Sequence, residues 1–228
     1  MDSARADFAS YFEDFRGIIA IPATASPDGR GWTKADTSAA GSPTLASVTP
    51  SVSGEVAGIL DSTNEVQNLC LYHGDVLNFS APLIQWFETK VKASASLNAA
   101  ISIAFGLTGA RNDTIDTIAY QALFRLIGSN TLYVESDDGV NDRDDVATGL
   151  SLDTTYRRFA IDFQGGLSAL KFFAEGSDGA LKRVARSTTF DLSNYTGGLQ
   201  PFFQIQKTAA AAVGSFTVDY VAIDSKRR

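Results

Sequence analysis

Short runs of alternating apolar and polar residues, separated by turn residues, fill the chain from Gly54 to Ile223. The last two runs, Leu199–Lys207 and Phe216–Ile223, show the alternation well, and this period of two is typical of half-buried β-strands. The link between them, residues 208–214, is too short for a crossover helix with its turns. We therefore expect these two strands to pair antiparallel and to close a large β-sandwich.

Ten earlier runs have the same character, and no long helical pattern interrupts the series. The expected strands are Gly54–Leu60, Val66–Tyr72, Ile84–Ala93, Ala100–Leu107, Tyr120–Ile127, Thr131–Ser136, Asp145–Gly149, Tyr156–Phe163, Ala169–Ala174, Leu181–Ala185, Leu199–Lys207 and Phe216–Ile223. Alternation of strands with helices, which would predict a parallel sheet, does not occur. A length of 228 residues suits one large all-β domain with less than about 15% helix.

The first 50 residues differ from the rest. Phe8, Tyr11, Phe12 and Phe15 follow one another at spacings of three and four, which favours a short amphipathic helix over residues 3–16, with a strand beginning at Phe12 as the alternative. Residues 22–50 hold four of the six prolines and read as irregular. We accordingly divide the chain into an N-terminal arm, residues 1–50, and a β-sandwich, residues 51–228.

This arm carries more large apolar side chains than a segment in contact with water normally exposes. Because its continuation lacks a strand pattern, we expect a partner to cover it, and we predict contacts with other subunits. The predicted interface residues are Phe8, Phe12, Phe15, Ile18, Ile19 and Trp32.

Composition excludes several classes of partner and cofactor. The formal charge of −7 and pI near 4.7 argue against a nucleic-acid-binding surface, which needs clustered Lys and Arg. The single cysteine, Cys70, excludes an intrachain disulfide and is expected to be buried and inert. No apolar run is long enough to span a membrane and no signal peptide is evident, so we expect synthesis in the cytoplasm. Phosphate-binding and dinucleotide-binding glycine motifs are absent, and no cofactor is expected.

Two stretches deserve consideration as chemical sites. The acidic segment 135–145 offers Asp137, Asp138 and Asp142 as weak calcium ligands, although acids on an ordinary turn explain it better and we predict no metal site. The only histidine, His73, has no nucleophile motif around it, which argues against a catalytic triad. Zinc is excluded, since a structural site needs four Cys or His ligands.

A β-sandwich of this size could also act on sugars or bind them. A glycosidase needs two carboxylates on one face, as in Glu-x-Asp, and no such pair falls within one expected strand. Glu88 and Asp162 stand alone on their strands as outward-facing residues, and we expect Glu88 to pair with Lys90 or Lys92. We therefore predict no enzymatic activity. The aromatic candidates for a sugar-binding face are Trp32, Trp86, Tyr133, Tyr156 and Tyr195, for which burial in the core is the competing reading.

The serial order of several short motifs resembles a known family. They are Phe87-Glu-Thr-Lys-Val-Lys92, Phe105-Gly-Leu-Thr-Gly-Ala-Arg-Asn-Asp113, Phe124-Arg125, Glu135-Ser-Asp-Asp-Gly139, Arg158-Phe-Ala-Ile-Asp162, Thr188-Thr-Phe-Asp-Leu-Ser193, Leu199-Gln-Pro-Phe202, Gln206-Lys207 and Val218-Asp-Tyr-Val221. Taken in order, they look like tailed-phage virion proteins with a concanavalin-like jelly-roll sandwich.

The resemblance implies a structural protein of the virion without catalytic residues. It suggests a capsid decoration or cement protein that binds the major capsid protein and assembles as a homotrimer. The alternatives are a carbohydrate-binding or receptor-binding virion module on the same sandwich, and a lyase or hydrolase.

Overall fold

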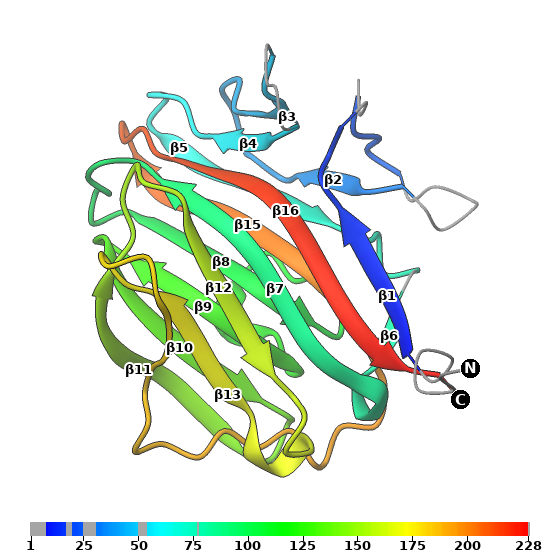
Figure 1. The fold of residues 1–228 in the computed structure, drawn as a ribbon. Coiled ribbons are helices and arrows are strands. Elements are labelled where there is room, and N and C mark those ends of the chain that lie inside the picture. The colour runs from blue at the N-terminus through cyan, green and yellow to red at the C-terminus, as the bar shows by residue number, and fades with distance from the viewer. Residues whose placement is uncertain (1–7, 17–19, 25–30, 50–53, 77, 228) are drawn as a thin grey trace.

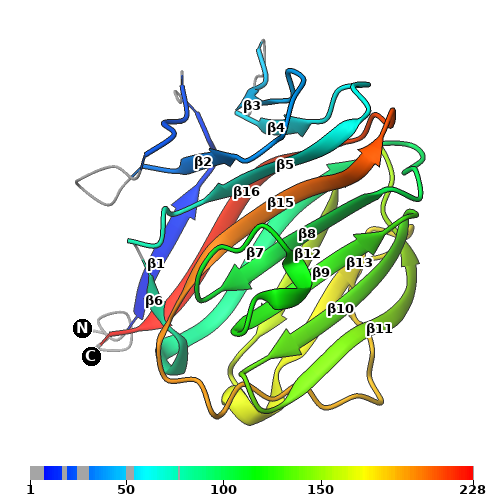
Figure 2. The ribbon, with the colours of Figure 1, turned by 180° about the vertical axis from the view of Figure 1, so that it is seen from behind.

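The computed structural model describes residues 8–16, 20–24, 31–49, 54–76 and 78–227. Two antiparallel sheets pack face to face, one seen from the front in Figure 1 and the other from behind in Figure 2. Strands make up 54% of the described residues and helix 4%, which confirms the predicted concanavalin-like jelly-roll sandwich. Among the described residues, no helix is long and apolar enough to cross a membrane.

Sheet A holds the strands at both ends of the chain. Its order is β14 (Leu181–Arg183), β13 (Lys171–Glu175), β12 (Arg157–Asp162), β7 (Ile84–Ala93), β16 (Ser215–Lys226), β4 (Val56–Ile59) and β3 (Thr44–Ser47). β1 (Phe8–Glu13) also pairs with β16, so the described ends of the chain lie side by side (Figure 1).

Sheet B is built mainly from the middle of the chain. Its order is β11 (Asp142–Ser151), β10 (Thr131–Asp137), β9 (Gln121–Ile127), β8 (Ile101–Thr108), β15 (Gly198–Ala210), β5 (Glu65–Tyr72) and β2 (Thr33–Asp36), and β6 (Phe79–Ser80) pairs with β15. The 3-10 helices η2 (Ala81–Leu83), η3 (Ile115–Thr117) and η4 (Leu167–Ala169) lie in connections.

The predicted pairing of the last two strands is wrong. β15 belongs to sheet B and β16 to sheet A, so the link between them crosses the edge of the sandwich. β15 pairs with β8 and β16 pairs with β7. The inner faces of β15 and β16 meet across the core, where the Phe203 and Phe216 ring centroids lie 6.4 Å apart. Buried Lys207 fastens this crossing, because its ammonium donates hydrogen bonds to the backbone carbonyls of Asp61, Thr63 and Ala212.

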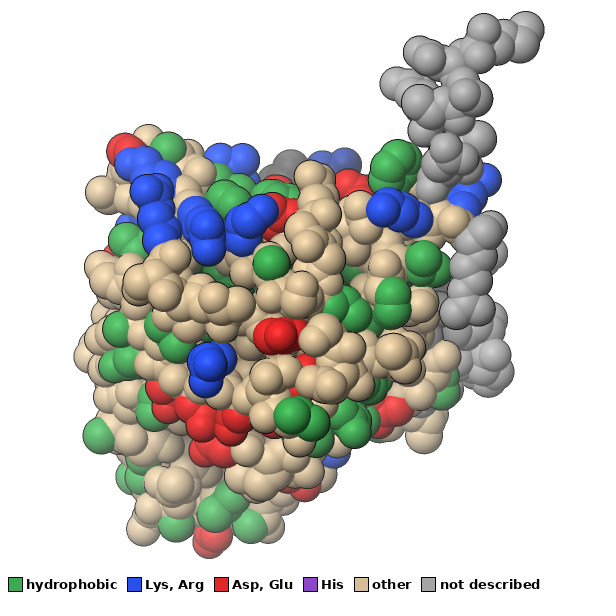
Figure 3. Space-filling view, turned by 90° about the horizontal axis from the view of Figure 1, so that it is seen from below, with side chains coloured by type: hydrophobic (Ala, Val, Ile, Leu, Met, Phe, Trp, Pro, Cys, Tyr) green, Lys and Arg blue, Asp and Glu red, His purple; other side chains and the backbone are tan. Residues whose placement is uncertain are grey.

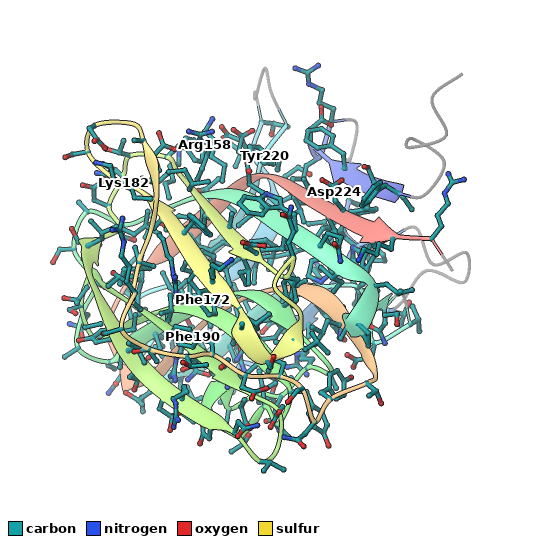
Figure 4. The ribbon with its side chains drawn as sticks, turned by 60° about the horizontal axis from the view of Figure 1, so that its bottom comes forward. Arg158, Phe172, Lys182, Phe190, Tyr220 and Asp224 are labelled. Carbon is teal, nitrogen blue, oxygen red and sulfur yellow. The ribbon has the colours of Figure 1, made fainter. Side chains whose placement is uncertain are left out.

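Phenylalanine rings fill the core between the sheets. Phe105 lies 4.8 Å from Phe159 and 5.4 Å from Phe124, ring centroid to centroid. Phe172 and Phe190, labelled in Figure 4, continue the packing between the sheets. The alternation of inward apolar residues on every long strand therefore accounts for the sandwich.

The described part of the first 50 residues is built into both sheets. β1 pairs with β16, β2 with β5 and β3 with β4. The expected helix is wrong over residues 8–13, because the free edge of β16 offers six residues of backbone pairing that an isolated helical turn could not match. The division into an arm and a separate sandwich is corrected accordingly.

Two of the six predicted interface residues lie elsewhere than expected. Phe15 and Trp32 are each 2% exposed in the core, with ring centroids 5.2 Å apart, and cannot form a contact surface. Phe8 and Phe12 are exposed, and Ile18 and Ile19 lie outside the described residues.

Gly54 holds the segment around Phe15 against the sandwich. Its φ is +75°, and a Cβ placed there would lie 2.2 Å from the carbonyl oxygen of Asp14. Only glycine allows both this backbone conformation and this close approach.

Candidate functional site

The outer face of sheet B is largely closed. Residues 109–120, between β8 and β9, lie across it (Figure 2), and Ile115 and Ile118 pack on Cys70 and Phe202. Side-chain amides of Asn68 and Gln204 donate hydrogen bonds to the backbone carbonyl of Asp113 and hold this segment down. Burial raises the pKa of the Cys70 thiol and keeps it protonated, as expected for an inert cysteine.

Three carboxylates converge on one buried guanidinium on this face. Arg125 Nη1 lies 2.7 Å from Glu135 Oε2, 2.5 Å from Asp116 Oδ1 and 3.4 Å from Asp145 Oδ1. Glu135 is 1% exposed, and burial raises its pKa to about 8, against the opposing effect of Arg125. Glu135 is the deepest of the three acids that share this cation, so desolvation favours its protonated form, whereas the Arg125 guanidinium favours the carboxylate.

Glu135 also belongs to a pair that the sequence prediction missed. β10 runs one residue further than expected and ends at Asp137, so Glu135 and Asp137 share one face of a strand as a Glu-x-Asp pair. On the neighbouring β9, however, the outward positions hold Gln121, Leu123 and Arg125. On β9, Glu135 is therefore opposite Leu123 and paired with Arg125, and Asp137 is opposite Gln121.

The acidic turn after β10 is organised by hydrogen bonds. Asp138 accepts bonds from the backbone and side-chain amides of both Asn141 and Asn194. Although burial opposes the shift, these bonds lower the pKa of Asp138 to about 2. Asp137 and Asp142 face each other across β10 and β11. No group of three or more Asp, Glu, His or Cys side chains in the described ranges is placed to hold a metal ion.

His73 lies in an aromatic cluster. Its Nε2 is 3.2 Å from the Tyr11 hydroxyl, and its ring centroid is 4.4 Å from that of Trp32. These neighbours anchor the N-terminal segment in the core and form no catalytic triad with His73.

The outer face of sheet A is open and carries aromatic rings. On β7 the inward residues Phe87 and Val91 alternate with outward Trp86 and Glu88. Trp86 contacts Phe173 of β13 with ring centroids 5.7 Å apart, and Phe12 of β1 stacks on Tyr220 of β16 at 5.8 Å. Figure 4 shows Tyr220, Arg158 and Asp224 along this side of the molecule.

Strand register places these groups in one row. Phe173, Ala160, Glu88, Ala222 and Phe12 are consecutive partners across β13, β12, β7, β16 and β1. At a strand spacing of ~4.8 Å the row is about 19 Å long. An aromatic pair lies on either side of the two alanines, of which Ala160 is fully buried and Ala222 half-buried, and we call this surface the aromatic face.

Glu88 is fixed at the centre of the aromatic face. Its carboxylate accepts hydrogen bonds from Trp86 Nε1 (3.2 Å) and from the Tyr220 hydroxyl (2.5 Å). Burial and this bond to Glu88 raise the pKa of Tyr220, which keeps the hydroxyl protonated. The expected pairing of Glu88 with Lys90 or Lys92 is wrong, since Lys90 instead pairs with Asp219 at 2.7 Å.

The other predicted aromatic candidates are scattered. Tyr133 is half-buried on the outer face of sheet B, Tyr156 lies under Lys92 Nζ at 4.3 Å, and Tyr195 stacks on Tyr120 at 4.2 Å. Sequence reasoning selected Trp86 for a sugar-binding face and assigned Phe12 to a subunit interface, but it missed Phe173 and Tyr220. Their outward positions follow from alternation along each strand, but their meeting depends on strand order, which the sequence does not display.

The sequence matches no protein-family model and no curated protein. Solved structures, in contrast, match over almost the whole chain. A β-glucanase of Bacillus licheniformis is 14% identical, with a TM-score of 0.57 over 96% of this chain and 98% of its own. A GH16 protein of Bacteroides ovatus, bound to a mixed-linkage glucan product, is 10% identical, with a TM-score of 0.57 over 93% and 99%. The potassium-bound carbohydrate recognition domain of Emp46p is 12% identical, with a TM-score of 0.50 over 90% and 94%.

At these identities the matches show the fold alone. The chain is a concanavalin-like jelly roll of the kind found in GH16 glucanases. The predicted capsid decoration function is wrong, because the similar structures are mostly glucanases together with a carbohydrate recognition domain, and none of these is a virion protein. The homotrimer, the capsid partner and the virion localisation were implied by that resemblance alone, and the structure of one chain does not test them.

Proposed function

We propose that this protein is a non-catalytic glycan-binding module whose aromatic face binds a neutral β-glucan chain. The observation that carries the proposal is the row from Phe173 to Phe12, with aromatic rings at both ends and Glu88 between them. Phe12 is 63% exposed, and Trp86, Phe173 and Tyr220 are half-buried, so ring surface remains open to a ligand.

The chemistry of the aromatic face suits a sugar chain. Aromatic ring faces carry partial negative charge and pack against the C–H edges of a pyranose ring. Sugar hydroxyls need hydrogen-bonding groups beside that apolar contact, and Glu88, Asp224 and Arg158 supply them. The row of about 19 Å is long enough for an oligosaccharide. The similar structures include a GH16 protein of a mixed-linkage glucan system and an endo-β-1,3(4)-glucanase, which guides the choice of ligand.

The side chains on the outer face of sheet B argue against glycosidase activity. A retaining or inverting glycosidase needs two carboxylates free to reach the scissile bond. Here Glu135 is buried against Arg125, and residues 109–120 cover the neighbouring strands. Leu123 and Arg125 on β9 would present no acid to a substrate.

Calorimetric titration with mixed-linkage β-glucan oligosaccharides tests the binding. We expect Trp86→Ala to weaken binding at least tenfold, about 1.4 kcal/mol. Tyr133→Ala is the matched control, because it removes a half-buried aromatic ring from the outer face of the other sheet. No binding by the unaltered protein, or equal losses in both variants, would refute the proposal. Release of reducing ends from β-glucan would refute its non-catalytic part.

A further inference from the structure

A groove runs along the edge of the sandwich where β11 of sheet B faces β13 and β14 of sheet A. Its main part has a volume of about 540 Å³, with Thr148 and Leu150 on one wall and residues 182–186 on the other. A smaller hollow of about 200 Å³ adjoins it, shares Leu150, Gly176 and Ser177, and adds Arg157. We call the two together the edge groove, and its main part falls in the range of small-molecule sites.

The edge groove is rich in cations on an acidic protein. Its lining holds Arg157, Lys182, Arg183 and Arg186 against only two carboxylates, Glu175 and Asp178. Figure 3 shows Lys and Arg side chains gathered at the upper left of that view, and Figure 4 labels Lys182 on the same side. With a formal charge of −7 for the whole chain, such a local excess is unusual.

Both carboxylates of the edge groove are already engaged. Glu175 Oε2 accepts hydrogen bonds from Arg158 Nε and from its backbone nitrogen, each at 3.0 Å, and Asp178 pairs with Lys182. Among the described residues, neither Arg157, Arg183 nor Arg186 forms an ion pair with a carboxylate, and the buried Nε atoms of Arg157 and Arg183 have no hydrogen-bond partner. The guanidinium groups of Arg183 and Arg186 are therefore left for an external anion, while the charge of Arg157 also acts on Glu175.

The arginines sit on a defined turn. Ala185 has a φ of +48°, a conformation that non-glycine residues rarely adopt and that concentrates at functional sites. Arg186 Nε donates a hydrogen bond to the carbonyl of Arg183 at 3.1 Å, and the backbone of Val184 is tied to Phe172. Because these contacts already order the turn, binding of an anion costs less conformational entropy of the protein.

We infer that the edge groove binds the anionic group of an acidic saccharide, a uronate carboxylate or a sulfate ester. Guanidinium groups match such oxyanions through paired hydrogen bonds, and exposed Ser177 can bond to sugar hydroxyls. The described lining includes no aromatic ring on which a nucleobase could stack. Arg183 is the register partner of Phe173, so it extends the row of the aromatic face to the edge groove.

The choice of a saccharide rests on the proposed function, whereas the anion site rests on the edge groove itself. The test is calorimetric titration of the unaltered protein with an oligoglucuronate, a sulfated oligosaccharide and inorganic phosphate, at low and at physiological ionic strength. We expect one of the acidic saccharides to bind, with an affinity that falls as salt rises.

The double variant Arg183→Gln, Arg186→Gln should weaken this binding at least tenfold. The control Lys226→Gln, Arg227→Gln, which also removes two positive charges, at exposed positions away from the edge groove, should leave it within twofold. Failure of all three anions to bind, or equal losses in the double variant and the control, would overturn the inference. Binding of inorganic phosphate alone would overturn its saccharide part.

The neutral glucan titration separates this inference from the proposed function. The double variant should retain neutral glucan binding, and Trp86→Ala should retain binding of the acidic ligand's anionic group to the edge groove. Loss of neutral binding with intact anion binding would remove the proposed function and keep the edge groove as an anion site.

Discussion

Two phenylalanines three residues apart test whether the N-terminal segment is part of the fold. Phe15 is 2% exposed and packs on Trp32, whereas Phe12 is 63% exposed and stacks only on Tyr220. Replacing a buried phenylalanine by alanine costs ~3–5 kcal/mol, through lost burial and the cavity left behind. Phe12→Ala removes the same atoms from a mostly solvated position and should cost less than about 1 kcal/mol.

The comparison isolates burial from backbone effects. Phe15 has a φ of +56°, and alanine carries the same Cβ, so the substitution leaves the backbone preference nearly unchanged. For a chain of this length, 3–5 kcal/mol corresponds to a fall in Tm of roughly 6–20 °C.

Urea denaturation followed by tryptophan fluorescence gives the two free energies of unfolding by linear extrapolation. Losses below about 1 kcal/mol for both variants would show that the segment is a detachable arm and would refute the reasoning. Removal of residues 1–50 supplies a second measurement, because it deletes β1, β2 and β3 and should prevent folding.

Three further predictions concern single positions. Gly54→Ala should destabilise the protein by more than about 1 kcal/mol in urea denaturation, because the new methyl would meet the Asp14 carbonyl; an unchanged midpoint would contradict this contact. Asp138, with its pKa lowered to about 2, should stabilise the fold above about pH 4 and lose this contribution as the pH falls toward 2. Asp138→Asn should therefore flatten the plot of unfolding free energy against pH between 4 and 2. A plot identical to that of the unaltered protein would contradict the lowered pKa. Glu135, with its pKa raised to about 8, should make the free energy of unfolding decline as the pH rises from about 4.5 to 8. Glu135→Gln should abolish this decline. A Glu135→Gln variant that still loses stability across this pH range would contradict the raised pKa of Glu135.

The sequence predicts the architecture of this protein better than its connections. Alternation along β7 identifies a strand and its inward face, because β7 is fully buried on one side only. β9 and β15 are buried on both sides, so their inward faces cannot be identified in the same way. Alternation does not identify partners: β15 and β16 are neighbours in the chain and lie in different sheets. The N-terminal segment was misjudged for the same reason, since β1 is a strand only through the free edge of β16.

The candidate site was only partly accessible from the sequence. Trp86 and Glu88 are marked by their outward alternation, but Phe12 and Phe173 come from strands far away in the chain. The Glu135 and Asp137 pair was not predicted, because the expected strand ended at Ser136, one residue before Asp137. The arginines of the edge groove carry no spacing motif, and they meet only because β14 lies at the end of its sheet opposite β11.

The positions of β15 and β16 also constrain how the chain can be made. Both are late in the sequence, yet each is central: β15 joins β8 to β5 in sheet B, and β16 joins β7 to β4 and β1 in sheet A. While a ribosome is still translating residues 1–197, each half-sheet lacks its bridging strand, and the inner faces of β7 and β8 stay exposed. Such long-range pairings form slowly and leave aggregation-prone edges in the meantime. The two bridging pairings of the sandwich can therefore form only after residues 198–226 have been made.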